Sequence, residues 1–171
     1  MAKLIFKYQD ETTVAPELVA AVNKLCADMK KDCTCTSGYR SIEKQKVINA
    51  QTLREHKGAI QKPDGSVWAD GKCWASAYGS SNHCFGLALD IPDAWFKALT
   101  NTQLAKYGLI KPMAYEPWHV EFIKYRGFNQ QQKAVFYFQL THNLVADGIA
   151  GPKTKSALAD VQNVISKMGV K

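Results

Sequence analysis

The fold is decided by one segment in the middle of the chain, Ser81-Asn-His83-Cys-Phe85-Gly86-Leu-Ala-Leu-Asp90-Ile91. From Phe85 to Ile91 apolar residues occupy every second position, which predicts a half-buried strand. His83 and Asp90 are an odd number of positions apart, so on one straight strand their side chains would face opposite sides. We therefore expect His83 to precede the strand, with Gly86 allowing the chain to bend.

A second segment, Glu116-Pro-Trp-His119, leads into another apolar strand, predicted at 118–123. Together the two segments hold two imidazoles and two carboxylates, which are costly to bury unless they are paired or bound to a metal. Catalytic zinc takes three protein ligands and leaves one position open for water. His83, Asp90 and His119 can supply these ligands, and Glu116 is then free to accept a proton from the water. Because a proline follows it, Glu116 is held at the strand entrance.

Helix and strand patterns surround these two segments. Their irregular order fits an α+β domain better than a repeated βαβ domain. The other predicted elements are a helix at 16–29, a strand at 32–36, a helix capped by Ser41 that runs to His56, and a helix at 94–106.

Between these elements, residues 58–81 form a long segment with two turn signals, Pro63-Asp-Gly and Asp70-Gly. It also carries three aromatic residues, Trp68, Trp74 and Tyr78. Two interpretations stay open: a binding lid, or a hairpin whose aromatic side chains simply pack.

The pattern changes near 124–130 and is purely helical afterwards. A helix is predicted at 130–142, followed by a turn at 145–152 and a second helix with one apolar stripe. We therefore place a catalytic domain at 1–126 and a short all-helical segment at 127–171.

Charge and composition narrow the possible partners. Most of the net charge of +7 lies in the last fifty residues or so, where basic residues, including Lys171, outnumber acidic ones. A basic tail favours a polyanion such as nucleic acid, anionic lipid or an anionic cell wall. No nucleic-acid-binding motif accompanies the charge, so we expect no nucleic-acid partner.

The spacing of the five cysteines is not that of a disulfide framework, and we expect reduced, mostly buried thiols.

The N-terminal residues lack the apolar stretch of roughly 7–15 residues that a secretory signal needs. No stretch approaches the ~18 apolar residues that would cross a bilayer. We therefore expect synthesis in the cytoplasm.

The two segments, with Ser37-Gly-Tyr-Arg40-Ser41 upstream, resemble the VanY-like family of zinc D-Ala-D-Ala carboxypeptidases and L-alanyl-D-glutamate endopeptidases, which includes phage endolysins. The resemblance covers roughly 36–121 and implies a small antiparallel sheet with flanking helices. It implies Zn²⁺ as the cofactor and peptidoglycan as the substrate. The site residues it implies are the zinc ligands His83, Asp90 and His119, the base Glu116, Arg40 for substrate binding and oxyanion stabilisation, and the substrate-contacting residues Ser81 and Trp118.

The C-terminal segment resembles a helical peptidoglycan-binding repeat, through Gln132 to Gln139 and the loop Asp147-Gly-Ile-Ala-Gly-Pro-Lys-Thr154. A helical hairpin that caps the catalytic domain is the alternative.

These features together favour a phage endolysin that cuts the L-Ala–D-Glu bond of the stem peptide. Such an enzyme would be a monomer, would stay in the host cytoplasm until a holin releases it, and could be weakly attracted to an anionic wall or membrane. The alternatives are a D-Ala-D-Ala carboxypeptidase of wall metabolism and a non-catalytic wall-binding protein.

Overall fold

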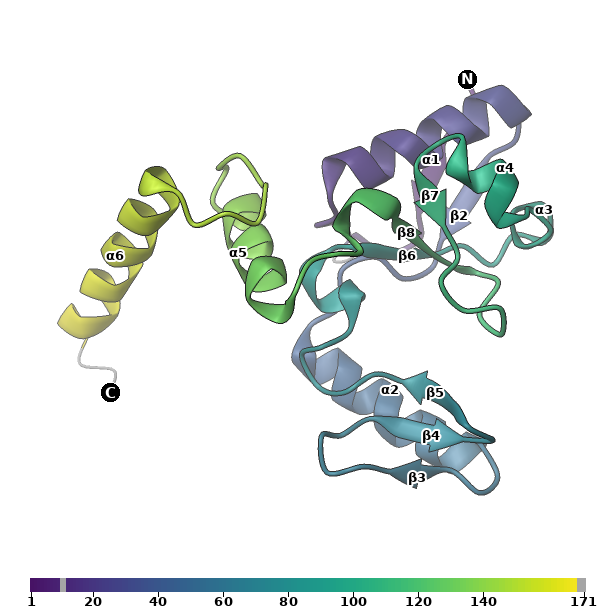
Figure 1. Ribbon diagram of the computed structural model, residues 1–171, viewed down its shortest axis with the longest axis horizontal. Coiled ribbons are helices and arrows are strands. Elements are labelled where there is room, and N and C mark those ends of the chain that lie inside the picture. Colours follow the sequence, from purple (N-terminus) through teal and green to yellow (C-terminus); the bar gives the residue numbers. More distant parts are fainter. Residues whose placement is uncertain (10–11, 169–171) are drawn as a thin grey trace. The chain divides into compact units, whose positions relative to one another are not determined.

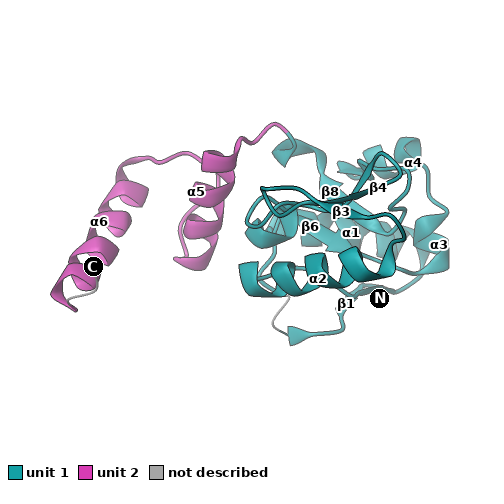
Figure 2. Ribbon diagram, turned by 90° about the horizontal axis from the view of Figure 1, so that it is seen from below, with its two compact units in different colours: residues 1–126 teal, residues 127–171 magenta. Residues whose placement is uncertain are grey.

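The computed structural model describes residues 1–9 and 12–168, and the chain divides into two compact units, 1–126 and 127–171 (Figures 1 and 2). Small sheets and several helices make up the first unit, and the second contains two helices. The predicted α+β class is confirmed. Lys171 of the predicted basic tail lies outside the described residues.

The sheet that positions the site has three antiparallel strands in the order β6-β8-β7: β6 (Ala88–Asp90), β8 (His119–Phe122) and β7 (Leu109–Ile110). In its register, Asp90 lies opposite His119 and Leu89 opposite Val120. Leu89 and Val120 are fully buried, so this sheet forms part of the core. Hydrophobic burial of the strand centres therefore fixes the ends that carry Asp90 and His119.

A second, two-stranded sheet is parallel and pairs β1 (Leu4–Phe6) with β2 (Cys33–Cys35). Helix α1 (Pro16–Met29) has Pro at its start and connects the two strands in sequence, as a parallel pair requires. Beyond β2, Ser37 makes a bridge to Asp90, with Asp90 N donating to Ser37 O at 2.8 Å. The second sheet is thereby joined to the first next to Asp90.

Helix α2 (Ile42–Glu55) begins at the predicted cap, because the Ser41 side chain accepts a hydrogen bond from Lys44 N. The segment after it is an antiparallel three-stranded meander, β3 (Ile60–Gln61), β4 (Val67–Ala69) and β5 (Lys72–Ala75). Trp74 on β5 stacks on His56 and lies against Tyr115, with ring centroids 4.4 and 5.3 Å apart. The segment is therefore a small sheet in which Trp74 packs against neighbouring rings, whereas Tyr78 is exposed. The binding lid stays a prediction.

The strand predicted from Phe85 to Ile91 is shorter than expected. Residues 82–85 form a 3-10 turn, and only Ala88–Asp90 are strand. Gly86 ends the turn at φ +66, and a Cβ there would lie 2.5 Å from the Thr13 carbonyl oxygen. The expected bend at Gly86, with His83 before the strand, is confirmed.

The helix predicted at 94–106 is two short helices, α3 (Ala94–Lys97) and α4 (Asn101–Ala105). Two features accompany the break. Thr100 and Gln103 form a capping box that starts α4. Lys111 Nζ also donates to the carbonyl oxygens of Phe96, Lys97 and Leu99 at 2.8–3.1 Å, at the point where the helix is interrupted.

The second unit consists of α5 (Gln130–Thr141) and α6 (Pro152–Lys167). The loop between them is organised by Gln139, a buried side chain that hydrogen-bonds to the backbone at Gly148 and at Ile149 within the loop.

No helix among residues 1–9 and 12–168 combines the length and the apolar character needed to cross a membrane. None of the five cysteines forms a disulfide, and four of them are buried.

Candidate metal centre

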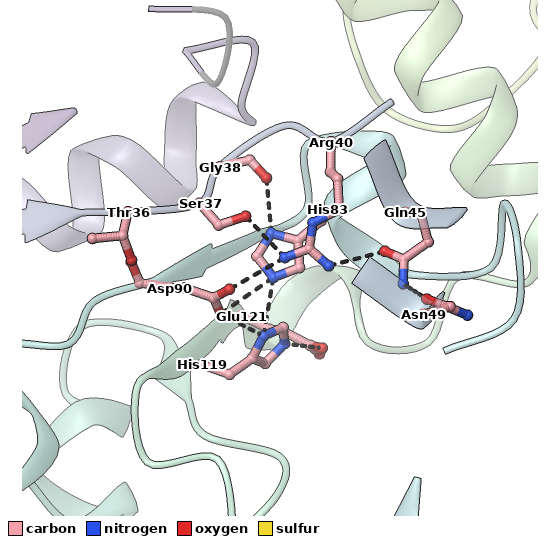
Figure 3. Close-up of polar contacts among 10 residues, drawn as sticks. All are labelled: Thr36, Ser37, Gly38, Arg40, Gln45, Asn49, His83, Asp90, His119 and Glu121. Atoms are coloured by element: carbon pink, nitrogen blue, oxygen red, sulfur yellow. Dashed lines mark hydrogen bonds and ion pairs between the residues drawn. The ribbon is translucent and has the colours of Figure 1, made fainter. Parts of the chain in front are cut away.

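Three side chains converge where β6 ends and β8 begins (Figure 3). Asp90 is the last residue of β6, and His119 is the first residue of β8. The antiparallel register places these two residues directly opposite each other. His83 reaches the same point from the 3-10 turn before β6.

The facing atoms of the three side chains form a small triangle. His83 Nε2 lies 3.2 Å from His119 Nδ1 and 3.3 Å from Asp90 Oδ1. The third side, from His119 Nδ1 to Asp90 Oδ1, is 3.1 Å long. A tetrahedral zinc ion with ligand distances of ~2.0–2.1 Å holds its ligand atoms ~3.3 Å apart. The triangle therefore has the size that zinc requires, and these residues form a candidate metal site.

Hydrogen bonds on the outer side of each ring fix which nitrogen faces the triangle. His83 Nδ1 lies 2.8 Å from the carbonyl oxygen of Gly38, which can only accept, so this nitrogen carries a proton. His119 Nε2 lies 3.1 Å from Glu121 Oε1 and is protonated for the same reason. In their neutral forms both rings turn a lone pair toward Asp90 Oδ1. Such a set of three acceptor atoms fits a bound cation.

The pKa values of the metal-free protein reflect the same geometry. Burial opposes ionisation of Asp90, but attraction to His83 and a hydrogen bond with His119 hold its pKa far below the usual range. Burial also lowers the pKa of His83. For His119, burial disfavours the charge, yet hydrogen bonds with Asp90 and Glu121 outweigh burial and raise the pKa to about 9. A proton on His119 thus occupies the place that a metal ion would take.

Arg40 is held at the edge of the triangle, with its side chain only 11% exposed. Its Nη2 donates to Ser37 Oγ at 2.9 Å and to Asp90 Oδ2 at 3.3 Å, and Nη1 donates to Gln45 Oε1 at 2.9 Å. Its backbone N donates to the carbonyl oxygen of His83 at 3.1 Å. These bonds fix the guanidinium beside the candidate ligands.

Glu116 lies in the turn before β8 and is half-buried. Its carbonyl oxygen accepts a hydrogen bond from His119 N at 3.0 Å. Burial raises the pKa of its carboxyl, and the nearby charges of His119 and Asp90 act on it with opposite signs. Glu116 is therefore close to the triangle without belonging to it.

Ser81 and Trp118 support the site through their backbone. The carbonyl oxygen of Ser81 accepts from Cys84 N at 2.9 Å, which starts the turn that carries His83. The carbonyl oxygen of Trp118 accepts from Ile91 N at 2.8 Å, which extends the pairing beyond Asp90. Substrate contact by either side chain stays a prediction.

Sequence reasoning missed three buried polar residues beside the site: Glu121, Gln45 and Asn49. Glu121 could have been found, because residues two apart on a strand share a face and His119 had been assigned to a strand. Gln45 and Asn49 gave no such signal. They face inward from α2, where the helical pattern leads one to expect apolar side chains.

The VanY family model, described as D-alanyl-D-alanine carboxypeptidase, matches residues 11–107 of the 171 in the chain. The match covers more than half of the chain and includes Arg40, His83 and Asp90. The chain belongs to the VanY D-alanyl-D-alanine carboxypeptidase family. The VanY match ends before Glu116 and His119, and the pairing of β6 with β8 brings His119 to the other two candidate ligands.

Solved structures similar to this VanY-family chain include two of VanY itself. One is a mutant of the vancomycin resistance D,D-pentapeptidase from the VanB-type cassette in complex with Zn(II), with 20% identity, TM-score 0.49, and 75% of this chain and 82% of that chain covered. The other is VanYB with D-alanine-D-alanine, with 20% identity, TM-score 0.49, and 78% and 83% covered. The LdcB LD-carboxypeptidase is a third, with 20% identity, TM-score 0.47, and 85% and 73% covered. No curated protein sequence matches the chain.

Proposed function

We propose that this protein is a zinc peptidase that hydrolyses the L-Ala–D-Glu bond in the stem peptide of bacterial peptidoglycan and acts as a phage endolysin. The observation that carries the peptidase assignment is the triangle of His83, Asp90 and His119, with sides of 3.1–3.3 Å, in a chain of the VanY family.

In this proposal His83, Asp90 and His119 hold the metal, and the other residues handle substrate and protons. Zinc bound there would lower the pKa of a water molecule toward ~7. Glu116 accepts the proton of the attacking water and gives it to the leaving amine. Burial raises the pKa of its carboxyl, which makes both transfers easier near neutral pH. Arg40 donates from Nη1 to the carbonyl oxygen that gains negative charge.

The contacts of Arg40 favour an internal cut over removal of a terminal residue. A carboxypeptidase must bind a free carboxylate, and arginine does this best with two parallel N–H groups. Both N–H groups of Nη2 are directed to Ser37 and Asp90, and Nη1 already donates once, to Gln45. Two donors remain, one on Nη1 and the buried Nε–H. They lie on different sides of the guanidinium and do not form the parallel pair that a carboxylate takes best, so each suits a single carbonyl oxygen better.

The endolysin role rests on the second unit and on charge. The loop with Asp147-Gly and Gly151-Pro, between two helices, supports a wall-binding function. Basic residues of α6, Lys153, Lys155 and Lys167, would add weak attraction to an anionic wall or membrane. We propose that the protein acts as a monomer and stays in the host cytoplasm until a holin releases it.

The test is mass spectrometry of purified peptidoglycan digested with wild-type protein, with chelator-treated protein, and with Glu116→Gln. We expect the wild-type digest to contain new peptides with D-Glu at the N-terminus. These peptides should be absent from the digests with chelator-treated protein and with Glu116→Gln. We expect the Glu116→Gln rate to be ~10²–10⁴-fold lower with zinc still bound.

The second candidate is a D-Ala-D-Ala carboxypeptidase, which the family description favours. It predicts free D-Ala in the same digest, with no D-Glu ends. A zinc-loaded protein that releases neither product would be a wall-binding protein without catalysis.

A further inference from the structure

One buried carboxylate beside the candidate metal centre has no part in the proposed chemistry. Glu121 lies on β8, two residues after His119, and is 8% exposed. Its Oε1 lies 3.1 Å from His119 Nε2, on the side of the ring that faces away from the triangle. The same oxygen accepts a hydrogen bond from Asn82 Nδ2 at 2.7 Å.

The Asn82–Glu121 hydrogen bond connects the two segments that carry the histidines. Asn82 directly precedes His83 in the 3-10 turn, whereas Glu121 and His119 share one face of β8. The two partners are 39 residues apart in sequence. Because a carboxylate only accepts, the Asn82 amide must turn its NH₂ group toward it. One carboxylate thus orients a ring on its own strand and holds the turn that carries the other ring.

We propose that Glu121 is a positioning residue for the metal, and that Asn82 supports it. This inference rests on the proposed zinc-dependent function. Glu121 keeps the proton of His119 on Nε2, turns the Nδ1 lone pair toward Asp90 and His83, and makes Nδ1 a better donor to a cation. A carboxylate in this place behind a metal-binding histidine strengthens metal binding by about 10–100-fold.

The side chain of Glu121 is not needed for the sheet itself. Its partners in the ladder, Ala88 on β6 and Ile110 on β7, are paired through the backbone. A purely structural role would therefore change the stability of the metal-free protein and leave zinc affinity alone. The proposed role changes zinc affinity in a protein that remains folded.

The experiment measures the zinc Kd of the full chain by competition with a chelating dye. We expect Glu121→Ala to bind zinc about 10–100-fold more weakly than wild type. Glu121→Gln, which keeps an acceptor oxygen but loses the charge, should bind zinc about three- to tenfold more weakly, and Asn82→Ala should fall in the same range. Glu43→Gln, an exposed carboxylate of α2, is the matched control and should leave the Kd unchanged.

A second readout tests orientation directly. In long-range ¹H–¹⁵N spectra of the zinc-loaded wild type, His119 should show a protonated Nε2. Circular dichroism establishes that each variant is folded. If Glu121→Ala does not fold, Glu121→Gln and Asn82→Ala decide the matter.

Two negative results are distinguishable. In the first, wild type binds zinc tightly and the folded variants have a Kd within twofold of the wild-type Kd. This result overturns the role of Glu121 and leaves the proposed function standing. Failure of wild type to bind zinc removes the proposed function itself, and this inference with it.

Discussion

At the residue scale, His119 links zinc binding to pH. In the metal-free protein burial opposes its charge, but Asp90 and Glu121 raise its pKa from the ordinary 6.5 to about 9, so zinc must displace a proton at neutral pH. We expect the zinc Kd to fall about tenfold per pH unit as the pH rises toward 9, and to level off above it. Calorimetry in buffers of different ionisation enthalpy should show close to one proton released at pH 7.

The same shift fixes the sign of a stability effect. A group whose pKa is raised by folding stabilises the folded state below its unfolded pKa, and this contribution is lost as the pH rises through the folded pKa. The metal-free protein should therefore lose part of its stability between about pH 6.5 and 9, while the zinc-loaded protein should not. A Tm that falls equally in both forms would contradict this assignment.

Arg40 allows a second prediction at this scale. Its planar group contacts Ser37, Asp90 and Gln45 at once, which a lysine ammonium cannot reproduce. Arg40→Lys should lower kcat/KM on peptidoglycan about 10²-fold, the typical cost of losing one donor to a developing oxyanion. Zinc affinity should change little, since Arg40 is not a candidate ligand. Arg54→Lys, exposed on α2, serves as control.

At the scale of elements, α2 and the meander are joined by a buried polar chain that begins at Arg40. Gln45 Nε2 donates to Asn49 Oδ1 at 2.6 Å, and Asn49 Nδ2 donates to the carbonyl oxygens of Gly65 and Ser76 at 2.7 and 2.8 Å. Asn49→Leu would remove all three of these hydrogen bonds and should cost about 2–4 kcal/mol of unfolding free energy. Urea denaturation measures the loss. The exposed Gln51→Leu on the same helix should cost less than about 0.5 kcal/mol.

The errors in the predicted elements coincide with contacts to residues far away in the sequence. Alternating apolar residues predicted a strand through Phe85, but Gly86 must turn there to pass the Thr13 backbone. The helix predicted at 94–106 is interrupted at the point where the Lys111 ammonium, more than ten residues further along, bonds to three carbonyl oxygens. Helix α2 was predicted correctly from its Ser41 cap, a local signal. What the sequence could not give was contact between distant segments, which depends on packing.

At the scale of the whole molecule, the candidate metal centre could be predicted because its chemistry is unusual for a core. Histidine and aspartate among buried strand residues must be paired or bound to a metal, and few pairings were available. The orientation of the rings could not be predicted, since it depends on Gly38, Glu121 and the register of β6 with β8. The spacing of residues along the chain indicates which side chains can come together. The strand register determines which of their atoms are in contact.

The division into two units leads to the last prediction. Gln139 organises the loop of the second unit: its Nε2 donates to Asp147 Oδ1, Ile149 O and Thr154 Oγ1, and its Oε1 accepts from Asp147 N and Gly148 N, all at 2.9–3.1 Å. Gln139→Ala removes every one of these bonds and should disorder the loop. If the second unit retains the protein on the wall, hydrolysis of insoluble walls should fall several-fold, while cleavage of a small soluble stem peptide should not change.

Sedimentation of the full chain with purified walls separates binding from catalysis when the chain also carries Glu116→Gln. Gln139→Ala in that background should leave most of the protein in the supernatant, and the exposed Gln131→Ala should sediment like the parent. Equal sedimentation of all three would favour the helical hairpin without wall affinity. Any sedimentation that all three proteins share would then come from binding by the catalytic unit.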